Sequence, residues 1–174
     1  MAGCHGEILE IKQKENFFDL KGFVEKESER LQKQNLPVLK VVVKGEKKEQ
    51  KKLSTLVWKD ELMSIAESDL NRPAWKTLYN SDTTFFEKSI LITYTGLNRD
   101  LAVKKMALTF DKDTKECISL SIDKASENFL YSSWQKIYYT AGGHLNIYGQ
   151  LDMHGIIKNE YASELVVINT NELE

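Results

Sequence analysis

The sequence predicts an α+β domain: a mostly antiparallel, curved β-sheet of about six to eight strands with two helices packed on one face. Three observations support this fold class. Apolar residues recur at helical spacing in two segments, and each segment ends before a proline, Pro37 or Pro73. From residue 86 onward, apolar and polar residues alternate, as they do in strands. Short turns join the alternating runs, which indicates that sequential strands pair antiparallel.

The composition is typical of a single globular domain. Of the 174 residues, 41% are hydrophobic and 29% are charged. The 24 basic and 26 acidic side chains give a net charge of −2, which excludes a dedicated electrostatic nucleic-acid binder. We expect residues 1–15 to form a flexible tail or tether and residues 16–174 to form one domain. The longest uncharged run, residues 137–151, is too short and too polar to span a membrane.

The first helix is expected to begin at Asn16, a favourable N-terminal cap, with Asp19 in its first turn. Its apolar stripe continues to Leu31, and Pro37 ends it. A β-branched run at residues 38–43 predicts a strand, and residues 50–56 predict a weaker returning strand. The lysines between residues 44 and 52 alternate with glutamates and lack aromatic neighbours, which favours a solvated hairpin over a nucleic-acid patch.

The second helix is expected to begin at Trp58 and to carry an apolar stripe through Leu62 and Ile65. It ends near residues 69–72, because Pro73 cannot continue it. The remaining strands are expected within residues 86–95, 101–110, 118–122, 129–140, 145–153 and 161–168. Residues 129–140 are a long aromatic strand or a short helix that runs into one.

Residues 58–75 contain a candidate structural anchor. Asp69 and Asn71 follow the second helix, where such residues commonly cap a helix and fix the next loop. We expect Trp58 and Trp75 to be buried between helix and sheet. A structural role for this segment is favoured over a ligand site.

No known catalytic signature is present. His144 and His154 flank the penultimate strand, and Asp152 lies two residues before His154, on the same face of a strand. An Asp and a His so placed suit a base and its orienting group, but no nucleophile and no third metal ligand accompany them. We therefore expect no catalytic residue, no metal site and no cofactor.

An aromatic cluster extends over two neighbouring predicted strands. It consists of Tyr131, Trp134, Tyr138, Tyr139 and Tyr148. Cross-strand packing under a helix is the favoured interpretation. The alternative is a ligand or partner surface, an apolar groove for a lipid or another small hydrophobic molecule.

Ala2-Gly3-Cys4 resembles the end of a bacterial lipobox, in which the cysteine becomes the first, lipidated residue of the mature protein. Only Met1 precedes these residues, so this hypothesis requires that a signal peptide has been removed and a start methionine added. Attachment to a membrane would then be by the lipid anchor alone.

Three longer stretches resemble a group of small uncharacterised lipoproteins from Bacteroidetes-type bacteria. They are "FFDLKGFVEKESERLQKQNLPVLKVV", "WKDELMSIAESDLNRPAW" and "YSSWQKIYYTAGGHLNIYGQ", and the resemblance covers most of residues 17–168. It implies a lipobox cysteine, which Cys4 matches, and a lipid-anchored, periplasm-facing place in the cell envelope. It supplies no activity, ligand or catalytic residue.

The sequence thus predicts a non-enzymatic cell-envelope lipoprotein domain that binds an apolar small molecule or an envelope protein. A curved sheet around helices is also the architecture of half-barrel lipoprotein carriers, a likeness of fold alone. Two alternatives stay open: a purely structural or interaction domain with a filled core, and a hydrolase-like enzyme.

Overall fold

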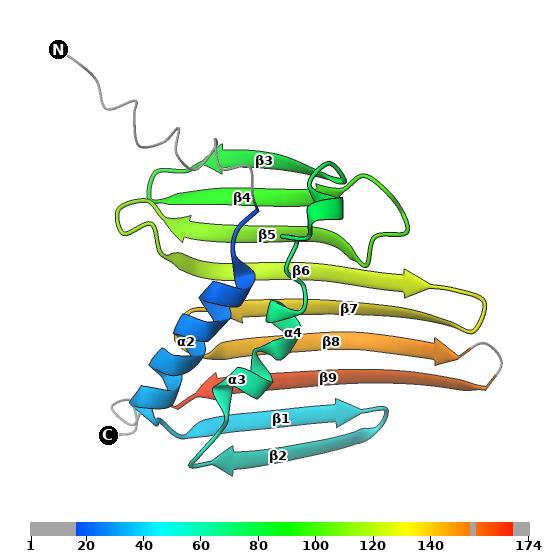
Figure 1. Cartoon of the computed structure of the whole chain (residues 1–174). Coiled ribbons are helices and arrows are strands. Elements are labelled where there is room, and N and C mark those ends of the chain that lie inside the picture. The colour runs from blue at the N-terminus through cyan, green and yellow to red at the C-terminus, as the bar shows by residue number, and fades with distance from the viewer. Residues whose placement is uncertain (1–16, 154–155, 169–174) are drawn as a thin grey trace.

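A computed structural model of the chain describes residues 17–153 and 156–168. Nine strands form one antiparallel sheet in the order β2-β1-β9-β8-β7-β6-β5-β4-β3, with helices on one of its faces (Figure 1). This confirms the predicted α+β architecture and the antiparallel sheet. The predicted tail, the Asn16 cap and Cys4 lie outside the described residues.

The helical elements are α2 (Leu20–Gln34), α3 (Trp58–Glu61), α4 (Met63–Ala66) and the 3-10 turn η1 (Pro73–Trp75). The strands are β1 (Val38–Lys44), β2 (Lys47–Leu53), β3 (Tyr79–Phe85), β4 (Ser89–Gly96), β5 (Val103–Asp111), β6 (Cys117–Glu127), β7 (Tyr131–Thr140), β8 (His144–Met153) and β9 (Ile157–Val167).

The predicted strand count of six to eight is too low, because the sequence pattern does not reveal β3. This strand reads Tyr-Asn-Ser-Asp-Thr-Thr-Phe and lies at the edge of the sheet, paired with β4 alone. An edge strand buries little, so it needs few apolar residues and lacks clear alternation. The other edge strand, β2, carries lysines at four of its seven positions, and such charges discourage pairing with another chain.

The helix α2 begins one turn later than the predicted cap. Asp19 is the cap, and its Oδ1 accepts a hydrogen bond of 2.9 Å from the Gly22 N–H. Asn35 ends the helix in the left-handed conformation with φ of 45°, which asparagine tolerates better than most residues. Pro37 then directs the chain into β1.

The predicted second helix is two short helices rather than one. Leu62, with φ of −88° and ψ of 0°, separates α3 from α4. The apolar spacing of Trp58, Leu62 and Ile65 survives the break, because all three side chains are buried. The face covered by helices therefore has three helical segments where two were expected.

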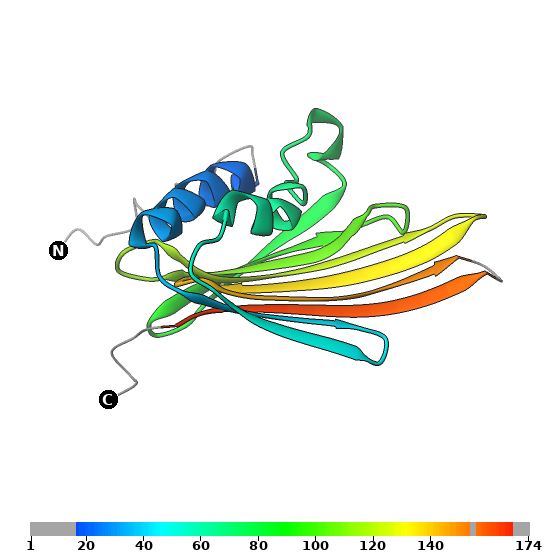
Figure 2. The ribbon, with the colours of Figure 1, turned by 90° about the horizontal axis from the view of Figure 1, so that it is seen from below.

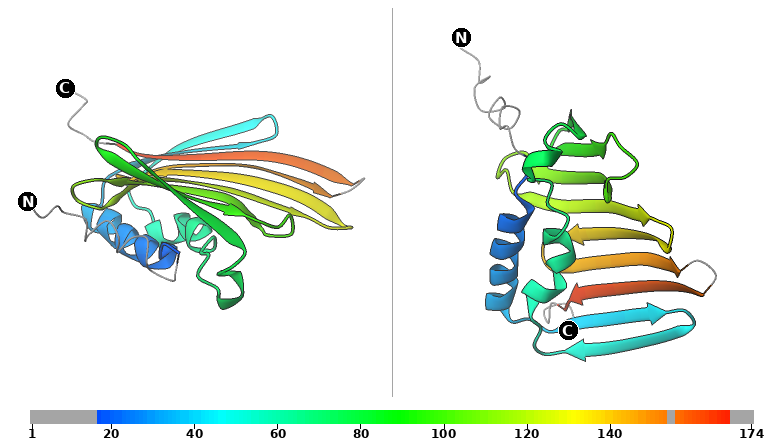
Figure 3. Two further views of the ribbon diagram at one scale, coloured as in Figure 1. Left: turned by 90° about the horizontal axis from the view of Figure 1, so that it is seen from above. Right: turned by 45° about the vertical axis from the view of Figure 1, so that its right-hand side comes forward.

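The core lies between these helices and the half of the sheet beneath them. The strands β6 to β9 continue well past the helices, so the other half of the same face has no helix over it (Figures 2 and 3). The strand β9 pairs with both β8 and β1, which joins the hairpin of β1 and β2 to the long meander. Among the described residues, no helix is long and apolar enough to cross a membrane.

Candidate functional site

One contact identifies the side of the sheet that each strand residue faces. The hydroxyl of Tyr139 on β7 donates a hydrogen bond to Glu27 on α2, so Tyr139 points toward the helices. The strands β6 to β9 pair in continuous register, and side chains alternate between the two faces. Every second residue from Tyr139 therefore lies on the same side, here called the helix-side face. The opposite side is called the outer face.

The helix-side face changes character along the strands. Beneath the helices it is apolar and buried, with Leu120, Tyr139, Leu145 and Leu165 opposite one another. Past the helices, apolar side chains on this face become accessible. Met153 is 39% exposed, and Ile157, opposite it on β9, is 47% exposed. We call this part of the face, which also includes Tyr131 and Leu151, the uncovered half.

A hollow of about 240 Å³ lies where the covered and uncovered parts meet. Its lining includes Ala102, Lys124, Ser126, Ser133, Gln135 and Tyr161. Gly149 makes room for the Tyr161 side chain, because a Cβ at this position would lie 2.3 Å from the Tyr161 Oη. The Tyr161 ring lies over the glycine, and its hydroxyl accepts a 3.1 Å hydrogen bond from the Gln135 side-chain amide.

Lys124 is the charged member of this lining. Burial lowers the pKa of its ammonium group, and the Glu67 carboxylate on the helix side offsets part of that effect. None of the ion pairs among the described residues includes Lys124. Lys124 is not among the residues predicted from the sequence, although the sequence pattern contains a signal for it. Leu120, Ile122 and Lys124 share one side of β6, so the lysine continues a buried row.

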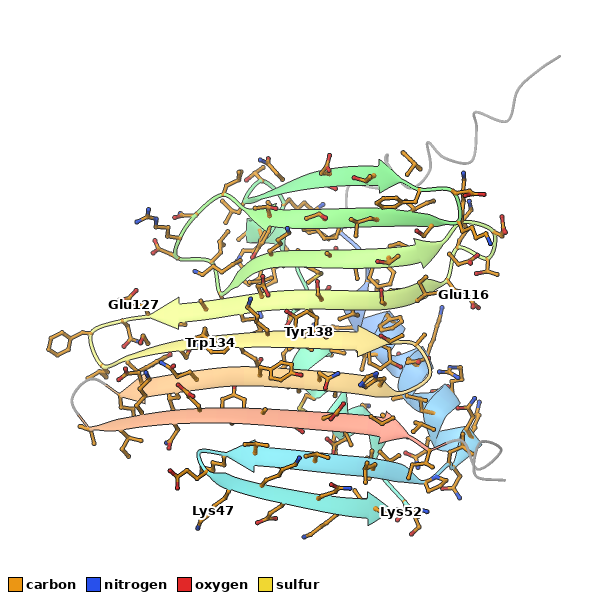
Figure 4. All side chains as sticks on the ribbon, turned by 180° about the vertical axis from the view of Figure 1, so that it is seen from behind. Lys47, Lys52, Glu116, Glu127, Trp134 and Tyr138 are labelled. Atoms are coloured by element: carbon orange, nitrogen blue, oxygen red, sulfur yellow. The ribbon has the colours of Figure 1, made fainter. Side chains whose placement is uncertain are left out.

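The predicted aromatic surface is divided between the two faces. Trp134, Tyr138 and Tyr148 lie on the outer face, away from the helices, and each is partly exposed. Figure 4 shows this face with Trp134 and Tyr138 labelled. The rings of Tyr138 and Tyr148 meet edge to face at 6.3 Å. Tyr131 lies on the helix-side face near the far end of β7, opposite Met153. Only Tyr139, from the same cluster, packs beneath a helix.

The structure separates the histidine and aspartate considered for catalysis. His144 begins β8, and its Nε2 lies 3.3 Å from Glu164 Oε1 and 3.0 Å from Asn146 Nδ2 on the exposed outer face. Asp152 lies eight residues further along the same strand, about 26 Å away at the usual rise per residue. His154 lies outside the described residues. Within residues 17–153 and 156–168, no three His, Cys, Asp or Glu side chains group as metal ligands do.

The anchor residues hold the chain between α4 and β3. The side-chain amide of Asn71 donates to Asp69 Oδ1 at 2.9 Å and to the Phe18 carbonyl at 3.1 Å. Asn71 is not among the described residues with positive φ, so it fixes the loop through its side chain and not through a left-handed backbone. Trp58 is 3% exposed, whereas Trp75 is only partly buried, against Tyr79 and the Arg72 guanidinium.

A second hollow, of about 680 Å³, lies between α2 and the segment from α3 to residue 72. Its lining contains three basic side chains, Lys21, Lys59 and Arg72, and three acidic ones, Glu25, Glu67 and Asp69. Because three positive and three negative charges compensate there, this hollow does not favour a ligand of either sign.

A buried carboxylate on α2 supports the fold. Glu27, 7% exposed, accepts two 2.7 Å hydrogen bonds from Arg30 in addition to the one from Tyr139. Burial by itself raises the pKa of Glu27, but the hydrogen bonds from Arg30 and Tyr139 outweigh it and lower the pKa below 4.5. Burial, and then the Glu27 carboxylate, raise the pKa of Tyr139 far above its ordinary value.

Cys117, on β6, belongs to the same interior. Burial raises the pKa of its thiol to about 12, which leaves almost no thiolate at neutral pH. The residue is a free cysteine and packs against the core, so its environment is that of a small apolar side chain.

Comparison with known proteins found no matching family model, no matching curated protein and no matching solved structure. The resemblance to small lipoproteins therefore stays a prediction.

Proposed function

We propose that this protein is a non-enzymatic binding domain and that the uncovered half of its helix-side face holds an apolar small molecule. The main support is the partial exposure of Met153 and Ile157, which lie opposite each other on the same sheet face that forms the core beneath the helices. Adjacent exposed apolar side chains beside a hollow are typical of ligand surfaces in proteins.

An uncharged fluorescent probe, N-phenyl-1-naphthylamine, tests this proposal. We expect its emission to increase on binding, and the double substitution Met153→Asn with Ile157→Asn to weaken binding at least about tenfold, because two apolar contacts are lost. Leu97→Asn is the matched control, since Leu97 is exposed but lies in the turn after β4. Equal binding by all three proteins, or no binding by any, would contradict the proposal.

We further propose that the domain works at the cell envelope, held there by a lipid on Cys4. Support comes from the Ala2-Gly3-Cys4 sequence and the lipoprotein resemblance. When the gene is expressed with a lipoprotein signal peptide in a bacterial host, an alkyne fatty acid is expected to label the wild type and Cys117→Ala. Cys4→Ala is expected to lose the label. If Cys4→Ala is labelled as strongly as the wild type, the anchor is elsewhere or absent.

A protein partner is the second candidate occupant, and the outer face favours it. Trp134, Tyr138 and Tyr148 form a partly exposed aromatic cluster there, and such residues are enriched in protein interfaces. In that case the domain would act through interaction alone, with a filled core beneath its helices. A hydrolase-like activity has weaker support, because His144 and Asp152 lie at opposite ends of β8.

A further inference from the structure

We propose that the ligand of the uncovered half is a single-chain amphiphile with one carboxylate, and that Lys124 binds the carboxylate while the exposed apolar side chains hold the chain. This inference rests on the proposed function and adds the chemical class of the ligand. It is argued from the position of Lys124, the donors around it and the surface beyond it.

Lys124 lies in a row that crosses the sheet on the helix-side face. It is opposite Gln135, which is opposite Gly149, which is opposite Tyr161. The row directly beneath the helices, which includes Ile122 and Ile137, is apolar and buried. Lys124 is thus at the boundary where the helices stop, and it is a half-buried residue that lines the hollow.

Each polar side chain around the hollow has a group that can donate a hydrogen bond. The Tyr161 hydroxyl accepts from Gln135, so its own hydrogen is directed elsewhere. Ser126 and Ser133, opposite each other on β6 and β7, line the same hollow with their hydroxyls. An ammonium group and three hydroxyls suit an acceptor, and a carboxylate is the strongest acceptor that carries a single negative charge.

The charge balance favours a monoanion. The hollow's lining contains one ammonium group and no carboxylate. Glu67, the acidic side chain that acts on Lys124, lies beyond ion-pair distance. A partly buried charge without a close partner is costly, and a bound carboxylate would remove that cost.

The space and the surface beyond the hollow fit one chain. A volume of 240 Å³ equals roughly eight water molecules, enough for a headgroup and its first carbons. From Gly149 the face continues through Leu151 to Met153, about 13 Å along β8, with Ile157 opposite Met153. An acyl chain that leaves the hollow in this direction passes Leu151, which lies between Ser133 and Asn159, and reaches the apolar pair of Met153 and Ile157.

Competition with N-phenyl-1-naphthylamine tests the inference, with decanoate, 1-decanol and acetate as the competitors. We expect decanoate to bind about tenfold more tightly than 1-decanol, because only decanoate carries the charge. Acetate is expected not to compete, since it lacks the chain. Lys124→Met should reduce decanoate binding to that of 1-decanol without changing 1-decanol binding, and Lys124→Arg should retain the preference.

Lys136→Met is the matched control, because Lys136 is exposed on the outer face of the neighbouring strand. If the probe binds but decanoate and 1-decanol compete equally, or Lys136→Met has the same effect as Lys124→Met, the carboxylate inference is wrong while the proposed function stands. If the probe does not bind at all, the proposed function itself fails. Self-association without probe or decanoate binding would identify this face as a protein interface and overturn the inference.

Discussion

Replacing Trp58 with alanine is expected to lower the free energy of unfolding by about 3–5 kcal/mol. The indole is 3% exposed and lies between the start of α3 and the turn that joins β7 to β8. A Cβ at Gly143 in that turn would come within 3.0 Å of the Trp58 ring, so the packing there is close. Truncation would leave a cavity that these neighbours cannot fill without moving.

The effect is measured from urea unfolding midpoints followed by far-ultraviolet circular dichroism. Trp75→Ala is expected to have a smaller effect, because that ring is only partly buried, against Tyr79 and Arg72. Lys47→Ala, on the exposed edge strand β2, is the surface control and is expected to change the midpoint little. A Trp58→Ala midpoint equal to that of the control would show that the indole is not a core residue.

The elements that the sequence predicts well are those whose residues alternate or recur strongly. Ile90 and Ile92 on β4, and Leu120 and Ile122 on β6, fall on the face that the helices cover, as their spacing indicates. The edge strand β3 escapes prediction for the opposite reason, since a strand with one neighbour and little burial has no strong pattern.

Other features depend on pairings that are remote in sequence. Nothing local in β1 indicates that it pairs with β9, more than 100 residues later. The contact of Tyr139 with Glu27 joins residues 112 apart, and Glu27 by itself looks like any charged residue on the solvent side of a helix. The placement of Trp134 and Tyr139 on opposite faces, in contrast, can be predicted from the sequence. Side chains alternate along a strand, so an even and an odd position of β7 must face opposite sides.

The candidate site, too, is predicted from the sequence only where a local pattern indicates it. The sequence indicates that β7 and β8 are aromatic, and it leaves open which residues a helix covers. Because α2, α3 and α4 are short, they leave the far part of β6 to β9 uncovered (Figure 2). The length of the helices relative to the strands therefore creates both the exposed apolar surface and the hollow next to Lys124.

The buried carboxylate of Glu27 gives the second large expected effect on stability. Glu27→Gln is expected to lower the free energy of unfolding at neutral pH by about 1.5–3 kcal/mol, the usual range for hydrogen bonds to a charged group. The neutral amide cannot accept both Arg30 bonds and the Tyr139 bond with the same strength. The expected loss is not larger, because the Arg30 side chain is 43% exposed and its charge can turn to solvent.

The effect of Glu27→Gln should also depend on pH. The pKa of Glu27 is lower in the folded protein than its ordinary value of 4.5. The ionised carboxylate therefore stabilises the fold fully above pH 4.5, and this contribution is lost as the pH falls through the folded-state pKa. The difference between wild type and Glu27→Gln is thus expected to be constant near neutral pH and to shrink in acid.

Urea unfolding of both proteins over a series of pH values measures this difference. Glu29→Gln is the matched control, because Glu29 lies on the same helix, is exposed and takes part in none of the ion pairs among the described residues. It is expected to unfold as the wild type does at every pH.

Tyr139→Phe should reproduce part of the loss of stability caused by Glu27→Gln, because it removes one donor to the carboxylate and raises the pKa of Glu27 toward its ordinary value. A difference between wild type and Glu27→Gln that stays the same from neutral to acid pH would show that the ionised Glu27 does not stabilise the fold.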